Sequence, residues 1–263
     1  MSLVRRAPRP ARSRLSAHQW APRARALSVR REDQLELLRH GAVGVEGRVA
    51  GSSNQALLVT LDLDGVSALA CYKAEAGERP LWDFDDGLWR REVAAWELDQ
   101  LLGTDLVPTT IAREDLPFGV GSLQWWIDDA TDDHYFTLRE KETLLDWFTD
   151  LCAFDVVANN ADRKGGHILF DTMRCWAIDH GLCFHEEEKL RTVIWEYAEE
   201  ALPDRLLEPL ARLGQGETGD LGFYLSAEEV EMTRRRAHQL LVASSFPSPD
   251  QDRDWPPYPW PLI

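Results

Sequence analysis

The stretch "NNADRKGGHILFD", residues 159–171, lies between an apolar run of helical spacing and a short apolar segment. It gathers Asp162, Arg163, Lys164, a Gly-Gly pair and His167 in one short connection. Catalytic and binding side chains are often concentrated on loops in this way, whereas most connections are simply polar. The stretch therefore predicts a reactive loop, and the simpler alternative is a turn in which Asp162 precedes two glycines.

A second acidic motif follows this loop. The segments "HILFD" (167–171) and "CWAIDHG" (175–181) predict a short pair of strands. Such a pair would bring Asp179 back towards Asp162. Two aspartates that meet in this way favour a reactive site over an isolated turn.

The first half of the chain predicts an antiparallel sheet. Residues 55–73, "QALLVTLDLDGVSALACYK", alternate as strands do on either side of Asp64-Gly65, a strong signal for a two-residue hairpin. The Gly- and Ser-rich turn 51–54 precedes the hairpin, and Lys73 ends it. The expected elements are five strands, within 46–50, 55–63, 66–73, 106–113 and 119–128, and one helix over 87–103.

The second half predicts helices. Apolar residues recur with helical spacing in residues 138–160, and Thr137 with Glu140 predicts a capping box before them. Ser226 with Glu229 predicts another capping box, at the start of a helix. Six prolines exclude a regular element from residues 247–263. That segment either hangs free or packs as a strap through its aromatic residues, which are Trp255, Tyr258 and Trp260.

Together these elements predict an α+β fold with two lobes. We expect a disordered Arg-rich tail over 1–31, a sheet-containing N-lobe over 32–125, a mainly helical C-lobe over 126–246 and a Pro-rich strap over 247–263. The tail holds nine Arg and no acidic residue. This composition suits a transit peptide, a solvated tail or a start codon assigned too far upstream.

Charge and cysteine content narrow the range of partners and cellular locations expected for this protein. The net charge is −16, and setting aside the nine arginines of the tail leaves −25 on residues 32–263. Such an acidic body disfavours nucleic acid and anionic membranes as partners. No apolar run approaches the roughly 20 residues that span a bilayer, so membrane insertion is not expected. The four cysteines form no C-x-x-C pair, which favours reduced thiols, a cytoplasmic location and no zinc site.

The order of the motifs suits phosphoryl transfer from ATP. A Gly-rich turn lets backbone N–H groups approach phosphates, and a strand-end lysine held by a helix acid pairs with phosphate oxygens. One carboxylate accepts the proton of the acceptor hydroxyl, and a second holds a divalent metal. The chain offers these groups in that order, as the turn 51–54, Lys73, an acid within 87–103, Asp162 and Asp179.

The two acidic motifs also carry a family resemblance. "NNADRKGGHILFD" and "AIDHGLCF" resemble the N-x-D-R-x-x-x-N catalytic loop and the metal-binding I-D-x-G of the phosphatidylinositol 3-/4-kinase-like branch of the kinase fold, including its bacterial HipA-type relatives. "AFDVVANN" is similar to the helix end that these proteins place before the loop. The resemblance spans about residues 40 to 200 and implies a bilobal protein-kinase-like fold that uses ATP with Mg²⁺ or Mn²⁺.

Carried over position by position, the resemblance implies a role for each site residue. Asp162 would be the catalytic carboxylate, Arg163 would hold the loop or touch the transferred phosphate, and Asp179 would be the main metal ligand. The nucleotide would be held by Lys73 and its anchor Glu92 (with Glu97 as a rival), by the turn Gly51, Ser52, Ser53 and Asn54, and by the hinge Gln124, Trp125, Trp126 and Ile127.

Two further positions near the loop carry expectations. His167 departs from the family pattern, which places Asn there as a second metal ligand. Imidazole suits Mg²⁺ poorly, so His167 either binds a softer metal such as Mn²⁺ or only forms hydrogen bonds. Asp155, late in the preceding helix, is expected to hydrogen-bond the backbone of the loop.

The acceptor is expected not to be a phosphoinositide. Residues 181–200 contain six Glu against one Lys and one Arg, whereas a lipid head group and membrane call for positive charge. We therefore expect a phosphotransferase that acts on a hydroxyl of a protein or small molecule. The alternatives are a nucleotide-binding pseudokinase, an AMPylase-like nucleotidyltransferase and a non-catalytic interaction domain.

Overall fold

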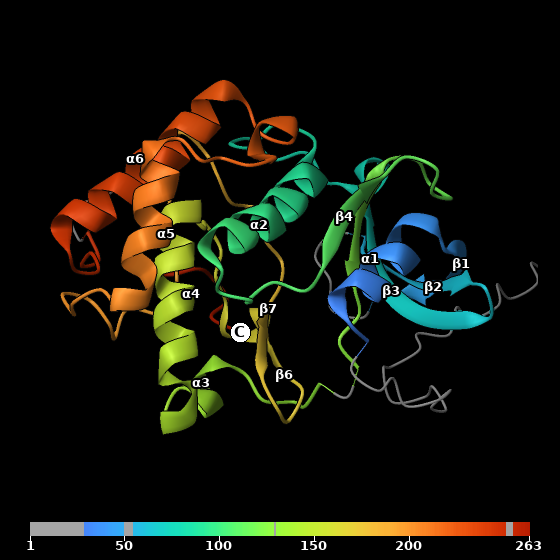
Figure 1. The fold of residues 1–263 in the computed structure, drawn as a ribbon, viewed down its shortest axis with the longest axis horizontal. Helices are drawn as coiled ribbons and strands as arrows, with labels where there is room; N and C mark the ends of the chain where they lie inside the picture. The colour runs from blue at the N-terminus through green and yellow to red at the C-terminus, as the bar shows by residue number, and fades with distance from the viewer. Residues whose placement is uncertain (1–28, 50–54, 129, 251–254) are drawn as a thin grey trace, which may run out of the picture.

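The computed structural model describes residues 29–49, 55–128, 130–250 and 255–263 (Figure 1). A β-sheet with a covering helix forms one side of the molecule, and helices form most of the other (Figure 1). Each side has its own hydrophobic core. The predicted α+β fold with two lobes is confirmed.

The sheet is antiparallel and has five strands, as predicted, and the structure gives their order as β1-β2-β3-β5-β4. Asp64 and Gly65 form the expected hairpin with φ angles of 49° and 81°. The first strand starts before the predicted 46–50 segment, because Ala42 already pairs with Asp62. The strands are β1 (Ala42–Arg48), β2 (Leu57–Leu63), β3 (Val66–Ala74), β4 (Thr110–Arg113) and β5 (Gly121–Trp125).

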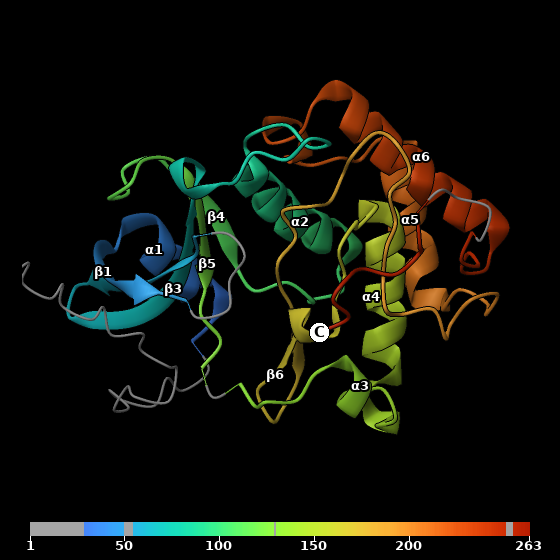
Figure 2. The same ribbon diagram turned by 180° about the vertical axis from the view of Figure 1, so that it is seen from behind.

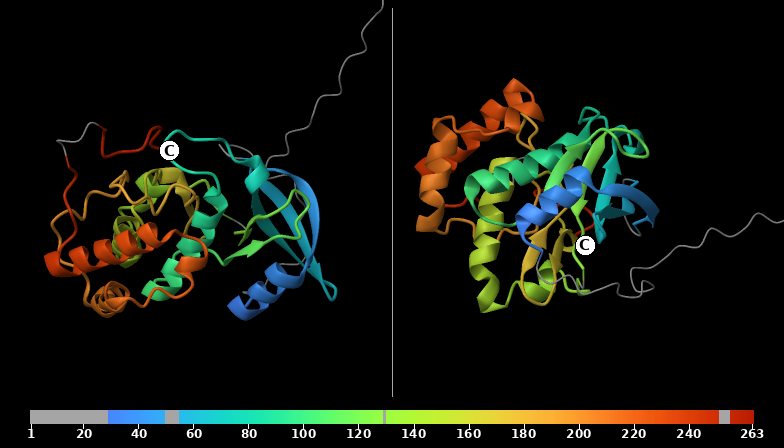
Figure 3. Two further views of the ribbon diagram at one scale, coloured as in Figure 1. Left: turned by 90° about the horizontal axis from the view of Figure 1, so that it is seen from above. Right: turned by 45° about the vertical axis from the view of Figure 1, so that its right-hand side comes forward.

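Helix α1 (Arg31–His40) lies beside the sheet (Figure 3). Leu37 and Leu38 are buried in the core of the sheet. This helix was not among the predicted elements, because its apolar residues are few among many charged ones. Arg31, the last residue of the predicted tail, is its first residue.

Helix α2 (Leu88–Leu102) lies between the sheet and the remaining helices (Figure 1). Gly87 and Gly103 bound it with left-handed backbone, which confirms the predicted helix. Apolar side chains of α2 join the core of the helical side rather than that of the sheet; they include Ala95, Leu98 and Leu102. Helix α2 thus packs its apolar side chains into the core of the helical side and also contacts strands β4 and β5 of the sheet.

The helical side contains four further helices and a strand pair. The strand pair occurs where the sequence predicted it, between the two acidic motifs. Short 3-10 helices occur at η2 (Glu75–Gly77), η3 (Glu142–Leu144), η4 (Gly165–His167) and η5 (Leu221–Phe223). The larger elements are α3 (Tyr135–Leu138), α4 (Leu145–Ala158), β6 (Ile168–Phe170), β7 (Cys175–Ala177), α5 (Asp204–Gln215) and α6 (Ala227–Ala243).

One predicted capping box is confirmed and the other is wrong. At the start of α6 the Ser226 hydroxyl accepts from the Glu229 N–H at 3.1 Å, and the Glu229 carboxylate accepts from the Ser226 N–H at 2.8 Å. Thr137 instead lies inside the short helix α3, where its hydroxyl accepts from the His134 N–H. The long helix begins only at Leu145, after a 3-10 turn, so the Thr137 box precedes a different element.

Residues 255–263 pack against the helical side as a strap that ends beside the strand pair (Figure 2). The Leu262 carbonyl accepts a hydrogen bond of 2.7 Å from the Gly165 N–H. The ring of Trp255 packs on another tryptophan at 5.9 Å between centroids, whereas Trp260 is 86% exposed. Backbone carbonyls and Trp255 therefore hold this segment in place, whereas the prediction of a strap relied on all three of its aromatic residues.

Two other properties bear on the expected location. All four cysteines are free. In the ranges that the structure describes, no helix combines the length and the apolar character needed to cross a membrane.

Candidate active site

The loop 159–167 is fixed by its own asparagines. Helix α4 ends at Asn159, whose backbone is left-handed (φ 51°) and whose side-chain amide donates to two carbonyls of the segment 185–187 at 2.9 and 2.6 Å. The side-chain oxygen of Asn160 accepts from the Asp162 N–H at 3.0 Å. The position of Asp162 is thus set by the asparagines at the start of the loop.

Arg163 is sealed beneath this loop, with no exposed side-chain surface. Its guanidinium forms an ion pair with Asp155 of α4 at 3.0 Å, donates to the Ile178 carbonyl at 3.0 Å and meets His180 Nε2 at 2.8 Å. Because the side chain is fully buried, this geometry favours the first of the two roles expected of Arg163, holding the loop, over contact with a phosphate.

Asp155 also differs from its expected role. Its carboxylate binds the side chains of Arg163 and Asn160 instead of the backbone of the loop. A buried charge without a partner is unfavourable, because it has lost its hydration. Asp155 and Arg163 therefore stabilise each other's charge. His180 beside them has its pKa lowered by burial, so it accepts the Arg163 hydrogen bond as a neutral ring.

Asp162 is only partly buried, with a quarter of its side chain exposed. Lys164 lies against it, with 2.6 Å between Nζ and Oδ2. Burial raises the pKa of Asp162, and the hydrogen bond from Lys164 acts in the opposite direction. A raised pKa makes a carboxylate a better proton acceptor, as a general base requires.

Lys73, Glu92 and Asp179 meet where the two sides of the molecule join. Lys73 ends β3, Glu92 lies on α2, and Asp179 follows β7. The Lys73 ammonium contacts Glu92 Oε1 and lies 2.7 Å from Asp179 Oδ1. Glu92 Oε2 also accepts from the His180 N–H at 3.1 Å, so one carboxylate joins the sheet, α2 and the Asp179 segment.

The charges of this cluster depend on each other. Burial alone would lower the pKa of Lys73, but Asp179 and Glu92 outweigh it and raise the pKa. Burial alone would raise the pKa of Asp179, but Lys73 and His167 outweigh it and lower the pKa. Lys73 is therefore charged and Asp179 ionised at neutral pH.

Glu97, the rival of Glu92, lies elsewhere on α2. Burial raises its pKa to about 7, with a further contribution from Asp220 and an opposing one from Arg39. None of these groups belongs to the site. Among the acids of α2, the contact with Lys73 is thus made by Glu92.

His167 stands against Asp179 on the side away from Lys73. Its Nε2 is 3.4 Å from Asp179 Oδ2, and burial lowers the His167 pKa to about 4. A neutral imidazole can bind a metal or accept a hydrogen bond. Asp179 itself has left-handed backbone (φ 62°), an uncommon conformation for a residue with a side chain and one that clusters at functional sites.

The donor set suits a metal that arrives with a nucleotide. Among the described residues, no group of three or more His, Cys, Asp or Glu side chains could hold a metal ion. Mg²⁺ in kinases is usually held by one or two carboxylates together with substrate phosphates and water. Asp179, 34% exposed and with His167 beside it, fits that pattern.

A pocket opens beside the Lys73–Glu92 pair. It is lined by Gln55, Trp89 and Gly181, among others. The predicted phosphate-binding turn, Gly51, Ser52, Ser53 and Asn54, lies outside the described residues. Gln55, at the edge of the pocket, directly follows that turn in the chain.

The predicted hinge is divided between the end of a strand and the connection after it. Gln124 and Trp125 belong to β5, and the Gln124 amide is buried and donates to the Thr110 hydroxyl at 2.9 Å. Trp126 and Ile127 follow the strand and are partly buried. The connection that leads to the helical side therefore begins at Trp126.

Sequence reasoning missed several residues that shape the site. Lys164 touches Asp162, and its position two residues further along the loop was the available signal. Arg91 precedes Glu92 and reaches the opposite side of α2, which only the packing of α2 against α6 reveals. His180 was part of the quoted I-D-H-G motif, but nothing in the sequence indicated its contact with Arg163.

The arrangement of a lysine–acid pair between sheet and helix, a carboxylate loop and an aspartate after a strand pair defines a two-lobed, kinase-like protein. The sequence profile described as phosphatidylinositol 3- and 4-kinase matches residues 93–246. The chain is also 38% identical over 273 aligned positions to Protein Rv2133c of Mycobacterium tuberculosis, covering 89% of this chain and 96% of that protein. The chain belongs to the phosphatidylinositol 3- and 4-kinase family, and the predicted family is confirmed.

Two solved structures align with most of the chain. The proinflammatory kinase CtkA of Helicobacter pylori aligns with a TM-score of 0.51 at 12% identity, covering 80% of this chain and 94% of that one. Fam20 of hydra, solved with sugar, aligns with a TM-score of 0.49 at 13% identity, covering 80% and 86%. The likeness to CtkA concerns the fold alone. Lys73 and Glu92 precede the span matched by the family profile, so their roles rest on geometry.

Proposed function

We propose that this protein is an ATP- and divalent-metal-dependent phosphotransferase whose acceptor is a hydroxyl of a protein or small molecule, not a phosphoinositide. The convergence of Lys73, Glu92 and Asp179 from β3, α2 and the segment after β7 carries the proposal. Packing of the two sides does not by itself require these three groups to meet at a partly exposed position. A nucleotide phosphate and its metal would give these groups a shared ligand.

In this proposal each residue has one task. Lys73 pairs with phosphate oxygens, Glu92 holds Lys73, and Asp162 orients the acceptor hydroxyl and accepts its proton. Asp179, with His167 beside it, would hold the divalent metal, which when bound neutralises charge on the phosphates. Arg163 does not touch substrate, and positions the Asp162 loop and the carbonyl before Asp179.

The charge of the acceptor side supports the second half of the proposal. Glu186 and Glu187, seven and eight residues after Asp179 in the chain, are 55% and 75% exposed. The neighbouring Lys189 is turned inward, and its side chain is 11% exposed. An acidic surface repels a phosphoinositide head group and suits a neutral or basic acceptor.

The test is phosphorus NMR of ATP incubated with the protein and Mg²⁺ or Mn²⁺. Production of ADP by the wild type, and its loss in Asp162→Asn and Asp179→Asn, is expected. Asp146→Asn is the matched control, because that carboxylate is 90% exposed at the start of α4. Phosphoinositide vesicles that are phosphorylated in an Asp162-dependent manner would overturn the acceptor class.

A second function is favoured by one observation, the histidine at the position of the second metal ligand. A changed metal site suits a nucleotidyltransferase that binds ATP in the opposite sense, or a pseudokinase that binds it without turnover. Pyrophosphate in place of ADP would identify the first. ATP signals broadened by wild type, but not by Asp179→Asn, without any product would identify the second.

A further inference from the structure

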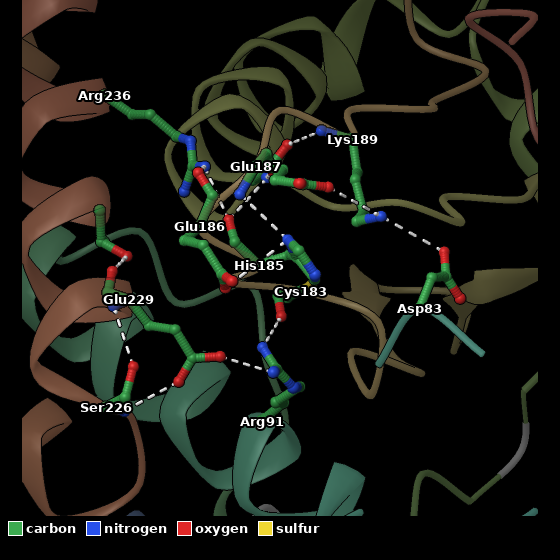
Figure 4. A network of polar contacts seen from close by, with 12 residues as sticks. Asp83, Arg91, Cys183, His185, Glu186, Glu187, Lys189, Ser226, Glu229 and Arg236 are labelled. Atoms are coloured by element: carbon green, nitrogen blue, oxygen red, sulfur yellow. Dashed lines mark hydrogen bonds and ion pairs between the residues drawn. The ribbon is translucent and has the colours of Figure 1, made fainter. Parts of the chain in front are cut away.

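Glu229 of α6 uses its two carboxylate oxygens for different purposes. Oε2 accepts from the Ser226 N–H at 2.8 Å and so completes the capping box of α6. Oε1 lies 2.5 Å from Nη2 of Arg91 on α2, and both side chains are about one-tenth exposed (Figure 4). The capping box needs only one oxygen, so the ion pair is a separate feature that joins α6 to α2.

Arg91 continues this link to the segment that follows Asp179. Its Nη1 donates to the Cys183 carbonyl at 2.5 Å (Figure 4). Its guanidinium also lies 5.1 Å from the centre of the Phe84 ring. Cys183 is four residues after Asp179. Arg91 therefore touches α6 and the Asp179 segment at once.

The next residue on α2 is Glu92, which points to the site. Successive residues of an α-helix project about 100° apart, so Arg91 and Glu92 hold different sides of α2. One binds Glu229 and Cys183, and the other binds Lys73 and the backbone of His180; each group is nearly buried. A rotation of α2 that released Arg91 would therefore also withdraw Glu92.

Helix α6 holds the same segment a second time. Arg236 Nη2 donates to the carbonyls of His185 and Glu186 at 2.7 and 3.0 Å (Figure 4). The segment after Asp179 is thus fixed by α6 directly at one end and through Arg91 at the other. This explains why α6, far from the Asp162 loop in sequence, can influence the site.

We propose that Arg91 and Glu229 are a pair of positioning residues that set the rotation of α2, and thereby hold Glu92 against Lys73 and the Asp179 segment. The effect of this pair on catalysis rests on the proposed phosphotransferase function. Its effect on the position of α2 does not depend on that function. The structural effect and the catalytic effect can therefore be tested separately.

The chain offers a matched pair of variants. Glu229→Gln removes the charge that holds Arg91, but glutamine still serves as the acceptor in a capping box. Ser226→Ala weakens the same capping box and leaves the Arg91–Glu229 ion pair intact. Arg91→Lys keeps the positive charge but cannot reach Glu229 and the Cys183 carbonyl together, because an ammonium lacks the planar fork of a guanidinium.

The structural readout is hydrogen–deuterium exchange of the nucleotide-free protein, followed in peptides covering residues 88–95. Glu229→Gln and Arg91→Lys should accelerate exchange there, while Ser226→Ala should accelerate it only in the first turn of α6. Unchanged exchange in 88–95 for both α2-releasing variants overturns the proposal. Acceleration spread evenly over the chain also overturns it, because a general loss of stability would then explain the effect.

The catalytic readout separates kcat from KM for ATP. Misplacing a catalytic group by about 1 Å can cost on the order of 10²-fold, so a fall in kcat of about 10- to 100-fold is expected for Glu229→Gln, with a smaller change in KM. Ser226→Ala should keep the wild-type kcat. Equal kcat losses in Glu229→Gln and Ser226→Ala contradict the proposal. If wild type produces no ADP, the proposed function fails, and the exchange experiment still decides the role of Arg91 and Glu229.

Discussion

Two charged clusters lie close together in this protein and differ in almost every physical respect. Arg163 and Asp155 are 0% and 1% exposed, and the guanidinium has carboxylate, carbonyl and imidazole partners. Lys73 and Asp179 are 17% and 34% exposed, and one ammonium is shared between two carboxylates. The first cluster is balanced and closed to solvent, whereas the second places one ammonium between two carboxyl groups and is partly open to solvent.

This difference in burial and charge separates a cluster that stabilises the fold from a cluster that can bind a ligand. A buried pair that is fully hydrogen-bonded has nothing left to offer a ligand, and removing either partner leaves an uncompensated charge. A cluster with one cation and two carboxylates attracts a further cation, and a divalent metal with its nucleotide supplies one. The comparison can be tested by breaking each cluster and measuring stability and activity together.

The largest effect on stability is expected from breaking the closed cluster. Arg163→Met should lower the free energy of unfolding by about 3–5 kcal/mol, because Asp155 is left buried and unpaired. Urea unfolding followed by circular dichroism measures this loss. Adding Asp155→Leu should recover much of it, since an apolar pair can replace a buried ion pair. A single variant as stable as wild type would contradict the assignment of Arg163 as a structural residue.

The open cluster should respond in the opposite way. Asp179→Asn should reduce ATP turnover by about 10²–10³-fold, because the charge that stabilises the reacting phosphates is lost. The free energy of unfolding should change by less than about 1 kcal/mol, since Lys73 keeps Glu92 as its partner. Turnover assays and urea unfolding of the same preparation check both values. A loss of stability as large as that of Arg163→Met would remove the distinction between the two clusters.

A smaller change at the open cluster sharpens the comparison. His167→Asn introduces the amide that the family usually has at this position, and amide oxygen suits Mg²⁺ better than imidazole does. The ratio of turnover with Mg²⁺ to turnover with Mn²⁺ should rise. Titration of both metals against wild type and variant measures the ratio. An unchanged ratio would limit His167 to orienting Asp179.

The smallest effect concerns Glu97, a half-buried acid on α2 outside both clusters. Burial raises its pKa to about 7, so the folded state holds its proton more tightly than the unfolded state does. Its contribution to stability is therefore present below about pH 4.5 and is lost as pH rises through about 7. Relative to wild type, Glu97→Gln should gain about 1–2 kcal/mol in unfolding free energy between pH 4.5 and 8. Urea unfolding at both pH values tests this, and parallel pH profiles would contradict it.

Local patterns of the sequence predicted much of the fold. The Asp64-Gly65 hairpin and the Ser226–Glu229 capping box depend on neighbouring residues, and both occur as expected. The Thr137–Glu140 box failed because Thr137 is the third residue of the short helix α3, which is capped by His134. Helix α1 was missed, since its burial depends on the sheet that it covers rather than on its own composition.

The site was predictable to the extent that its residues fall within motifs. Asp162, Asp179 and Lys73 stood out by residue type and order, and the family resemblance added Glu92. Lys73 contacts both Glu92 and Asp179. The burial of Arg163 and the link from Arg91 to Glu229 could not be foreseen, because both depend on how α4 and α6 pack. Residue type identifies a charge, whereas tertiary packing decides whether it is sealed or available.

The place of α2 has a consequence for synthesis on the ribosome. Its apolar face, with Leu98 and Leu102, packs in a core whose other helices begin only at Tyr135. A nascent chain therefore carries this face without those helices until α4 has left the exit tunnel. Exposed apolar surface of this kind favours aggregation and chaperone binding. Translation that stops between α2 and α4 should thus yield insoluble products, whereas a stop after α6 should not.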